Sequence, residues 1–407
     1  MLGAGILGSC TALELADRGE RVCLFERNAD PISEASLYNE GKIHLGFVYA
    51  ADPTFRTAER MIWGAVRFMD VLARWIPSRT LSVLSTRPFD YVVHRETMVP
   101  IPDIEAHFRR VGMAIDQLIP SKTEAVALDP SRPTWRRLSG AELAQRYDPG
   151  VILAAYETCE LAIDTLGLAE PIRAAVRSHP NIDLITHARV VTVKDRSGGC
   201  FEVHFESEGR SQAESFAGVV NALWTNRPHL DRKYGLPPEK PCYIRHKLGV
   251  NLNMDPVPSE IPCFTVSLGP FGDAVVYPSG RVYLSWYPVC MVGTNRTGGE
   301  TDWDVVLGQV DQEQIQRETV EAMTRICPAI GTCGLGRSTR TSVNGGSIFA
   351  PGQSDIDDRQ SELHERLDYG FHGRGTFLSV DTSKFTLGPA MAIKAADHLT
   401  ALLGRRT

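Results

Sequence analysis

Apolar residues recur at helical spacing near the start of the chain, over residues 7–18, and Gly19 would close this helix. The short apolar run over 21–26 follows directly and fits a buried parallel strand. The same spacing predicts further helices, at 54–76, 161–177, 311–327 and from about 388 to the C-terminus. A helix that leads at once into a buried strand indicates an α/β protein.

Short apolar runs of strand character lie between these helices. They include 91–94, a pair of strands over 182–206 that turns at 197–199, the run 216–224, several strands within 229–334 and the run 375–380. The stretch 81–135 has a different character, because strand-like runs are mixed there with proline and polar segments. We therefore expect the chain to cross into a second domain near this stretch.

Composition narrows the class of protein. With 407 residues, 43% hydrophobic and 23% charged, the chain has room for two ordinary globular domains. A net charge of −6 gives no reason to expect nucleic acid or an anionic membrane as partner, and no apolar run reaches the length of a membrane span. The nine cysteines are scattered without a paired spacing, so we expect no metal site, no disulfide framework and a cytoplasmic location.

The chain begins with a glycine turn of the kind that holds a dinucleotide. In Gly3-x-Gly5-x-x-Gly8, the first glycine permits a tight turn, the second lets a pyrophosphate approach the backbone, and the third lets helix and strand pack closely. The following strand ends at Glu26, whose carboxylate suits a ribose hydroxyl and would repel a 2′-phosphate. The alternative is a glycine-rich turn with a purely structural role.

Only Met1 and Leu2 precede this turn, although it normally follows a central strand of the sheet. The absence of that strand would expose the edges of its two neighbours. We expect a start several residues upstream of Met1, and the alternative is a truncated chain that folds poorly.

Three further segments resemble FAD-dependent oxidoreductases of the D-amino-acid oxidase superfamily. They are Ala35-Ser-Leu-Tyr-Asn-Glu-Gly-Lys-Ile-His-Leu-Gly46, Leu161-Ala-Ile-Asp-Thr-Leu-Gly-Leu-Ala169 and Asp381-Thr-Ser-Lys-Phe-Thr-Leu-Gly-Pro-Ala390. The Ile-His-x-Gly element is most similar to the branch that holds L-2-hydroxyglutarate oxidase and glycerol-3-phosphate dehydrogenase. The resemblance implies an α/β fold with a discontinuous Rossmann-like FAD-binding domain (1–85, 150–228 and 335–407). It also implies a mostly antiparallel β-sheet substrate domain with helices (86–149 and 229–334).

Together, the fingerprint and the resemblance imply a set of FAD-binding residues. The set is Gly3, Gly5, Ile6, Leu7, Gly8, Glu26, Arg27, Ser36, Asn39, Gly41, Lys42, Val190, Thr386, Leu387 and Gly388. Pro389 suits the first turn of the last helix, so the backbone N–H groups of the three residues before it would face the negative charge of a reduced flavin. The alternative is an ordinary packing helix. No cysteine stands out for covalent attachment, so we expect non-covalent FAD.

One segment departs from the family pattern. Where the family usually has a small Ala-Gly step, the strand over 216–224 ends in Asn221-Ala-Leu-Trp224 without a glycine. This departure puts Ala222 and Trp224 in doubt as cofactor contacts.

The resemblance places His44 beside the flavin, and a histidine titrates in the range that suits a general base. A carboxylate substrate favours a bidentate arginine, for which Arg340 is the first choice. Further candidates for the substrate pocket are Arg337, Arg374, Lys384, Tyr283, Trp286 and Tyr287.

These features predict an FAD-dependent oxidoreductase that dehydrogenates a CH–OH or CH–NH bond of a small polar substrate by hydride transfer to flavin N5. The His44 context slightly favours a hydroxy acid over an amine or amino acid. Two other readings stay open: an inactive nucleotide-binding or partner protein that retains the fold, and a nicotinamide dehydrogenase. The sequence does not identify the electron acceptor, which could be oxygen, a quinone or another compound.

Overall fold

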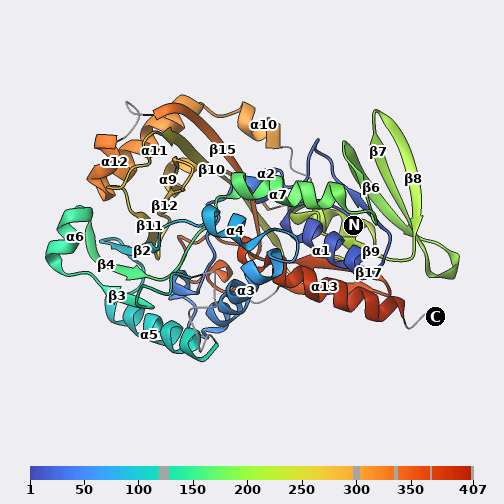
Figure 1. Cartoon of the computed structure of the whole chain (residues 1–407), viewed down its shortest axis with the longest axis horizontal. Helices are drawn as coiled ribbons and strands as arrows, with labels where there is room; N and C mark the ends of the chain where they lie inside the picture. The colour runs from blue at the N-terminus through green and yellow to red at the C-terminus, as the bar shows by residue number, and fades with distance from the viewer. Residues whose placement is uncertain (119–127, 297–302, 334–337, 367–368, 405–407) are drawn as a thin grey trace.

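The computed structural model describes residues 1–118, 128–296, 303–333, 338–366 and 369–404, and it confirms a mixed α/β architecture (Figure 1). Its helices are α1 (Ile6–Asp17), α2 (Glu34–Leu37), α3 (Arg56–Leu72), α4 (Ser78–Leu84), α5 (Ile101–Leu118), α6 (Gly140–Arg146), α7 (Thr165–Ser178), α8 (Arg227–Lys233), α9 (Tyr287–Cys290), α10 (Trp303–Gly308), α11 (Gln312–Ile326), α12 (Pro328–Cys333) and α13 (Gly388–Leu403). Among these described residues, no helix is both long and apolar enough to cross a membrane.

The strands are β1 (Val22–Phe25), β2 (Phe89–His94), β3 (Trp135–Arg137), β4 (Ile152–Thr158), β5 (Ile182–Ile185), β6 (Ala188–Asp195), β7 (Phe201–Ser207), β8 (Arg210–Phe216), β9 (Val219–Asn221), β10 (Cys242–Met254), β11 (Cys263–Ser267), β12 (Gly272–Val276), β13 (Arg281–Trp286), β14 (Met291–Asn295), β15 (Ser338–Pro351), β16 (Gly370–Arg374) and β17 (Phe377–Asp381). They form two main sheets and one smaller meander.

The first sheet carries the glycine turn. β1 pairs in parallel with β5, and β9 pairs in parallel with β17, which also pairs with β16. Leu2 joins the two halves, because it forms parallel bridges to both Phe25 and Asn221. The Leu2 N–H donates to Val220 O at 2.9 Å, and the Phe25 N–H donates to Met1 O at 3.0 Å. The place expected for a first central strand is therefore filled by Met1 and Leu2.

The second sheet is larger and mostly antiparallel. Among the described residues it has nine strands, in the order β14-β10-β13-β12-β11-β2-β4-β3, with β15 paired to β10. The pair β2–β11 is parallel. β4 and β15 belong to this sheet, although their residues fall within the ranges predicted for the FAD-binding domain. The domain division itself stays a prediction.

The expected strand pair over 182–206 is realised differently. β5 leaves to pair with β1, while β6, β7 and β8 form an antiparallel meander at the right of Figure 1. The turn at Ser197–Gly199 lies between β6 and β7 as predicted. The apolar run predicted over 216–224 is interrupted: Phe216 ends the exposed strand β8, and only β9 is buried.

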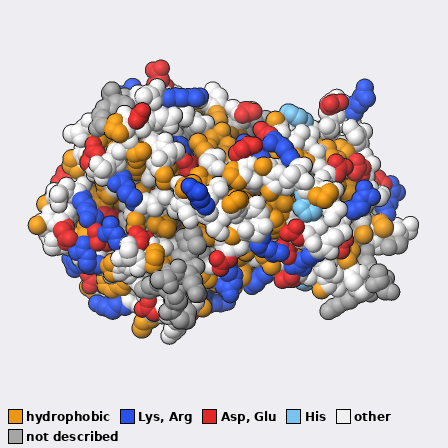
Figure 2. All heavy atoms as spheres, viewed as in Figure 1, with side chains coloured by type: hydrophobic (Ala, Val, Ile, Leu, Met, Phe, Trp, Pro, Cys, Tyr) orange, Lys and Arg blue, Asp and Glu red, His pale blue; other side chains and the backbone are white. Residues whose placement is uncertain are grey.

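Helices cover the two sheets, and one large hydrophobic cluster spans both sheets, while a second cluster lies between the first sheet and the meander. The terminal helices α1 and α13 pack side by side (Figure 1), and a Cβ on Gly388 would lie 2.8 Å from Ile6 Cγ2. Helices α4 and α5 lie on either side of β2, and neither helix was predicted. In α5 the buried residues Ile104, Phe108, Val111 and Ile115 follow helical spacing. Charged side chains of both signs are interspersed over the face seen in Figure 2.

Candidate active site

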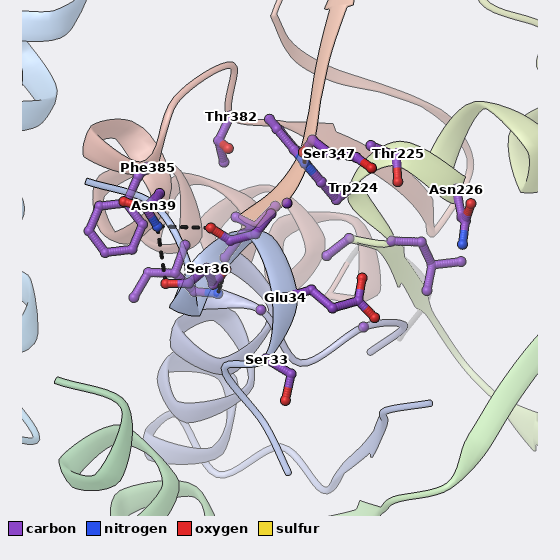
Figure 3. Close-up of a pocket in the computed structure, with 18 of the residues that line it drawn as sticks. Ser33, Glu34, Ser36, Asn39, Trp224, Thr225, Asn226, Ser347, Thr382 and Phe385 are labelled. Atoms are coloured by element: carbon purple, nitrogen blue, oxygen red, sulfur yellow. Dashed lines mark hydrogen bonds between the residues drawn. The ribbon is translucent and has the colours of Figure 1, made fainter. Parts of the chain in front are cut away.

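A cavity lies between the two sheets, with about 1750 Å³ of empty space including its open mouth. Figure 3 shows its walls: Ser36 and Asn39 come from the α2 region, Trp224 and Thr225 from the segment after β9, and Thr382 and Phe385 from the segment after β17. Of the predicted site residues, it is lined by Gly3, Gly5, Ile6, Leu7, Glu26, Arg27, Ser36, Asn39, Lys42, His44 and Val190.

The glycine turn has the close contacts that its spacing predicted. Gly3 adopts a φ of +88°, and a Cβ there would lie 2.9 Å from Ala222 O. A Cβ on Gly5 would lie 3.0 Å from Ser36 Oγ. A Cβ on Gly8 would lie 1.9 Å from Gly3 O, so this residue serves helix packing and does not line the cavity. The turn leaves open a backbone-lined cradle at the start of α1.

The acid at the end of β1 is held in place. Glu26 Oε2 accepts from the Ala4 N–H at 2.9 Å, and Oε1 accepts from the Asn28 N–H at 2.9 Å. Burial raises the pKa of this carboxyl. Oε1 also accepts from the Asn28 side-chain amide at 2.9 Å, so it is Oε2 that keeps a further lone pair for a ligand hydroxyl. Beside it, Arg27 forms an ion pair with Glu34 at 2.6 Å, and both residues line the cavity.

The residues after α2 are ordered by their own hydrogen bonds. Ser36 Oγ accepts from the Ile6 N–H at 3.0 Å, which places a hydroxyl at the N-terminus of α1. The Asn39 amide donates to Ala35 O at 2.8 Å and to Ser36 O at 3.1 Å, as the dashed lines in Figure 3 show. Gly41 does not line the cavity; a Cβ there would lie 2.0 Å from Ile163 O. Its role is close packing beneath the site.

The segment after β9 lines the cavity even though it lacks the family's glycine. Ala222, Trp224 and Thr225 all contribute to the wall. Trp224 has a φ of +52°, and its indole N–H donates to Ser347 O in β15 at 2.7 Å. Both Ala222 and Trp224 therefore line the cavity, and the doubt about them as cofactor contacts stays a prediction. The indole anchors this loop to the large sheet.

The C-terminal element lines the cavity one turn earlier than predicted. Its wall residues are Thr382, Ser383, Lys384 and Phe385, whereas Thr386, Leu387 and Gly388 lie behind them. The Leu387 N–H donates to Lys384 O at 3.0 Å, and the Gly388 N–H donates to Phe385 O. The sequence suggested that these two N–H groups are free to face the flavin. They are not, because a short 3₁₀ turn over Phe385–Leu387 uses them.

Thr386 instead fixes the segment that carries His44. Its hydroxyl donates to Lys42 O at 3.1 Å and accepts from the His44 N–H at 3.0 Å. The His44 ring is buried beside Tyr49, with ring centroids 5.9 Å apart. Neither His44 Nδ1 nor the Tyr49 hydroxyl has a hydrogen-bond partner among the described residues. Burial, and then the charges of Lys384 and Lys42, hold the pKa of His44 well below its usual value, so the imidazole is neutral.

Sequence analysis missed the carboxylate behind His44. Glu160 is fully buried and accepts hydrogen bonds from the Tyr91 hydroxyl and, at 2.6 Å, from the Leu45 N–H. Its Oε1 lies 3.9 Å from His44 Nδ1. Burial raises its pKa to about 7. The signal was its position directly before the segment 161–169, which pairs with the chain around Lys42.

Two lysines share one buried acid on the wall formed by the large sheet. Lys42 Nζ lies 2.6 Å from Asp273 Oδ1, and Lys247 Nζ lies 3.6 Å from Asp273 Oδ2. Lys42 also donates to Thr265. Burial opposes ionisation of Asp273, but the two ammonium groups outweigh it and hold the pKa of this carboxyl below its usual value. One carboxylate therefore faces two cations.

Arg366 and Lys384 add positive charge near His44. The buried Arg366 guanidinium donates to the Tyr369 hydroxyl at 2.7 Å, its Nε has no partner, and within the described residues it forms no ion pair. The half-buried Lys384 ammonium forms no ion pair within the described residues either, although the Glu40 carboxylate, which lines the same cavity, acts to raise its pKa. Burial, and then the charge of Arg366, lower the pKa of Lys384 to about 7.

Several other candidates lie elsewhere. Arg340 is exposed on β15, paired in register with Asn253, and does not reach the cavity. Arg374 is also exposed and contacts Asp195, while Arg337 lies outside the described residues.

Of the aromatic candidates, Tyr283 lines the cavity. Lys247 lies over the Tyr287 ring, 4.4 Å from its centroid.

The cavity fits FAD by its shape and its donors. The glycine cradle has no room for a Cβ, Glu26 lies at the end of β1, and unpartnered buried groups line the part around His44. Within the ranges described, no group of His, Cys, Asp or Glu side chains is placed to hold a metal ion.

Comparisons with known proteins agree with this geometry. A curated relative, D-amino acid dehydrogenase of Rhizobium rhizogenes, is 23% identical over 218 residues, and the chain spans about half of its length (48%). Glycine oxidase of Geobacillus kaustophilus superposes with a TM-score of 0.66 at 15% identity, over 99% of this chain and 93% of that one. L-α-glycerophosphate oxidase of Mycoplasma pneumoniae, solved with FAD bound, gives 0.62 at 14% identity over 98% and 93%. These structures show a shared fold. The profile of the FAD dependent oxidoreductase family matches residues 2–398, so the chain belongs to that family.

Proposed function

We propose that this protein dehydrogenates a small 2-hydroxy acid, whose carboxylate binds between Arg366 and Lys384 and whose hydroxyl faces His44. Bound FAD supplies the acceptor for the hydride that leaves the substrate carbon. The observation that carries the proposal is the pair of cations near His44, Arg366 and Lys384, neither of which forms an ion pair among the described residues.

An anionic substrate follows from the cost of burying charge. A buried guanidinium without a counter-charge is strongly unfavourable, and a ligand carboxylate would relieve it with two parallel hydrogen bonds. The unpartnered Arg366 Nε and Tyr49 hydroxyl lie behind the residues that line the cavity, and a side-chain movement would bring them to such a ligand as donors. Lys247, which shares Asp273 with Lys42, adds positive charge on the opposite sheet. A second acidic group on the substrate would be favoured there.

The same cations favour a hydroxyl over an amine at the reacting carbon. An amino acid in water carries an ammonium group, which Lys384 and Arg366 would repel, whereas the charge of Lys42 is compensated by Asp273. A hydroxyl is neutral and meets no such repulsion. His44 is neutral because of its burial and its cationic neighbours, so it can accept the hydroxyl proton through a ring nitrogen.

A second candidate is an amino acid as substrate, since relatives and structural neighbours carry the names D-amino acid dehydrogenase and glycine oxidase. Such a substrate would have to bind with its amine neutral. The alternative of an inactive nucleotide-binding protein does not explain why positive charges are buried near His44 without ion pairs.

The test is anaerobic mixing of the FAD-loaded protein with a panel of 2-hydroxy acids and 2-amino acids, followed by flavin absorbance. We expect hydroxy acids to bleach the flavin. Arg366→Met should raise the half-saturating concentration about 10- to 150-fold, because a hydrogen bond to a charged group contributes about 1.5–3 kcal/mol. Arg340→Met is the matched control, since this exposed arginine lies outside the cavity and its loss should change little.

Bleaching by amino acids alone would reverse the choice of substrate. Bound FAD that no member of the panel bleaches would favour the inactive protein. An equal effect of Arg340→Met and Arg366→Met would remove Arg366 from the site.

A further inference from the structure

We infer that Glu160 takes up the proton that His44 removes from the substrate, so that a buried carboxylate behind the imidazole completes the proton path. This inference rests on the proposed function of His44 as the base. Glu160 acts through His44 and is therefore a positioning residue that also stores a proton.

The geometry aligns the two groups through the backbone. The segment 160–163 pairs with the segment that carries His44, since the Ile43 N–H donates to Leu161 O at 2.9 Å. Glu160 Oε2 accepts from the Leu45 N–H at 2.6 Å, the residue directly after His44. The side chain of Glu160 is thus tied to the same short loop as the imidazole. A change in one position carries the other with it.

The atoms that would exchange the proton face each other. His44 Nδ1 is buried without a partner, and Glu160 Oε1 lies 3.9 Å away. This is about 1 Å longer than a hydrogen bond, a gap that a small ring movement closes. Catalytic hydrogen bonds are commonly long before substrate binds. Among the described residues, His44 Nε2 has no hydrogen bond either, which leaves it for the substrate hydroxyl.

The charges around the pair decide where the proton rests. His44 faces Lys42, Lys384, Arg366 and Asp273, and burial among these mainly positive groups disfavours an imidazolium. Glu160 faces Lys42, Asp273, the Tyr91 hydroxyl and the Leu45 N–H, and burial raises its pKa to about 7. Protonation removes the charge of a fully buried carboxylate, whereas protonation of His44 adds a charge to a crowded positive site.

The step balances as two coupled transfers. The substrate O–H bond breaks and an N–H bond forms at His44 Nε2, while the Nδ1–H bond breaks and an O–H bond forms at Glu160 Oε1. The imidazole is neutral before and after, with its proton moved from one nitrogen to the other. The hydride leaves the substrate carbon separately, toward the bound flavin. No further reactant is needed.

The experiment compares infrared difference spectra of the FAD-loaded protein before and after anaerobic reduction by its substrate. The wild-type protein should gain the carbonyl stretch of one protonated carboxyl, and Glu160→Gln should lack it. The reduction rate at saturating substrate should fall as the pH drops below about 7, because a protonated Glu160 cannot accept. Glu160→Gln should reduce roughly 10- to 100-fold more slowly, less than the loss expected for His44 itself, and should lose this inflection.

Glu157→Gln is the matched control, because this carboxylate on β4, three residues before Glu160, pairs with Arg136 and Arg146 away from the cavity. It should keep the infrared band and the inflection. If Glu160→Gln fails to fold, Tyr91→Phe replaces it: the loss of one donor raises the pKa of Glu160 further, so the inflection should move to higher pH.

The band persisting in Glu160→Gln, or an unchanged pH profile in Tyr91→Phe, would overturn the inference. The proposed substrate fails differently: amino acids would then bleach the flavin and hydroxy acids would not. The infrared and pH readouts use whichever substrate reduces the flavin, so the two failures are separable.

Discussion

The two parts of the cavity offer a ligand different things. Around Gly3 and Gly5 the wall is backbone, shaped so closely that an added Cβ would meet neighbouring atoms. Around His44 the wall is made of charged and unpartnered side chains, so the charge of a ligand decides how well it binds there. A change at the first part should alter how much flavin is held. A change at the second should leave the flavin bound and alter its reduction.

The largest effect is expected at His44. His44→Ala should slow anaerobic flavin reduction by roughly 100-fold or more, because general-base catalysis contributes at least that factor. Flavin content, measured by absorbance after gel filtration, should not change. His398→Ala serves as control, since this histidine is exposed on α13. Loss of flavin from His44→Ala would contradict the prediction that this part of the cavity affects flavin reduction but not flavin binding.

The next effect concerns the turn. Gly3→Ala should weaken FAD binding about 5- to 150-fold, because a non-glycine residue at its φ of +88° costs about 1–3 kcal/mol, and the Cβ also approaches Ala222 O. Titration of the apoprotein with FAD measures this. Gly19→Ala is the control: its φ of +90° is similar, but nothing lies within 4 Å of the added Cβ. Equal losses in both variants would mean that strain alone, and not the cradle, sets the affinity.

The smallest effect sharpens the charged part. Lys384 has a pKa near 7, so an anionic substrate analogue should bind the protonated form better, and its Kd should rise as the pH increases through 7. Isothermal titration across this range should show a change of about tenfold at most. Lys384→Met should flatten the dependence. A curve that keeps its slope in Lys384→Met would assign the titration to another group.

The cradle could be predicted because its requirements are local. One short stretch of sequence contains all the elements of the cradle. Gly3, Gly5 and Gly8 predict a tight turn that a pyrophosphate can approach closely, and Glu26 predicts a partner for the ribose. The structure bears out their close contacts. The fold class was likewise visible, because helical and strand spacing are properties of single segments.

The charged part could not be predicted in the same way. Arg366 and the exposed Arg340 look alike in sequence, and only the fold distinguishes the first, because it buries the guanidinium and brings its charge near His44. Glu160 becomes a partner of His44 because two distant segments pair. Helix α5 was not predicted for a local reason. The prolines at 100 and 102 were interpreted as a sign of irregular structure, although proline is compatible with the first turn of a helix.

The ladder between β10 and β15 has a bearing on how ligands enter. It runs from Cys242–Pro351 to Met254–Ser338, and it contacts the cavity at Ser347 near its middle. A Cβ on Gly346 of β15 would lie 2.7 Å from Ala35 Cα, so the ladder presses directly on the α2 region. A hinge motion that separated the two sheets would break the packing of this ladder against α2 and expose the hydrophobic cluster that the sheets share. We therefore expect substrate and product to exchange through movements of surface loops, with the two sheets staying packed together.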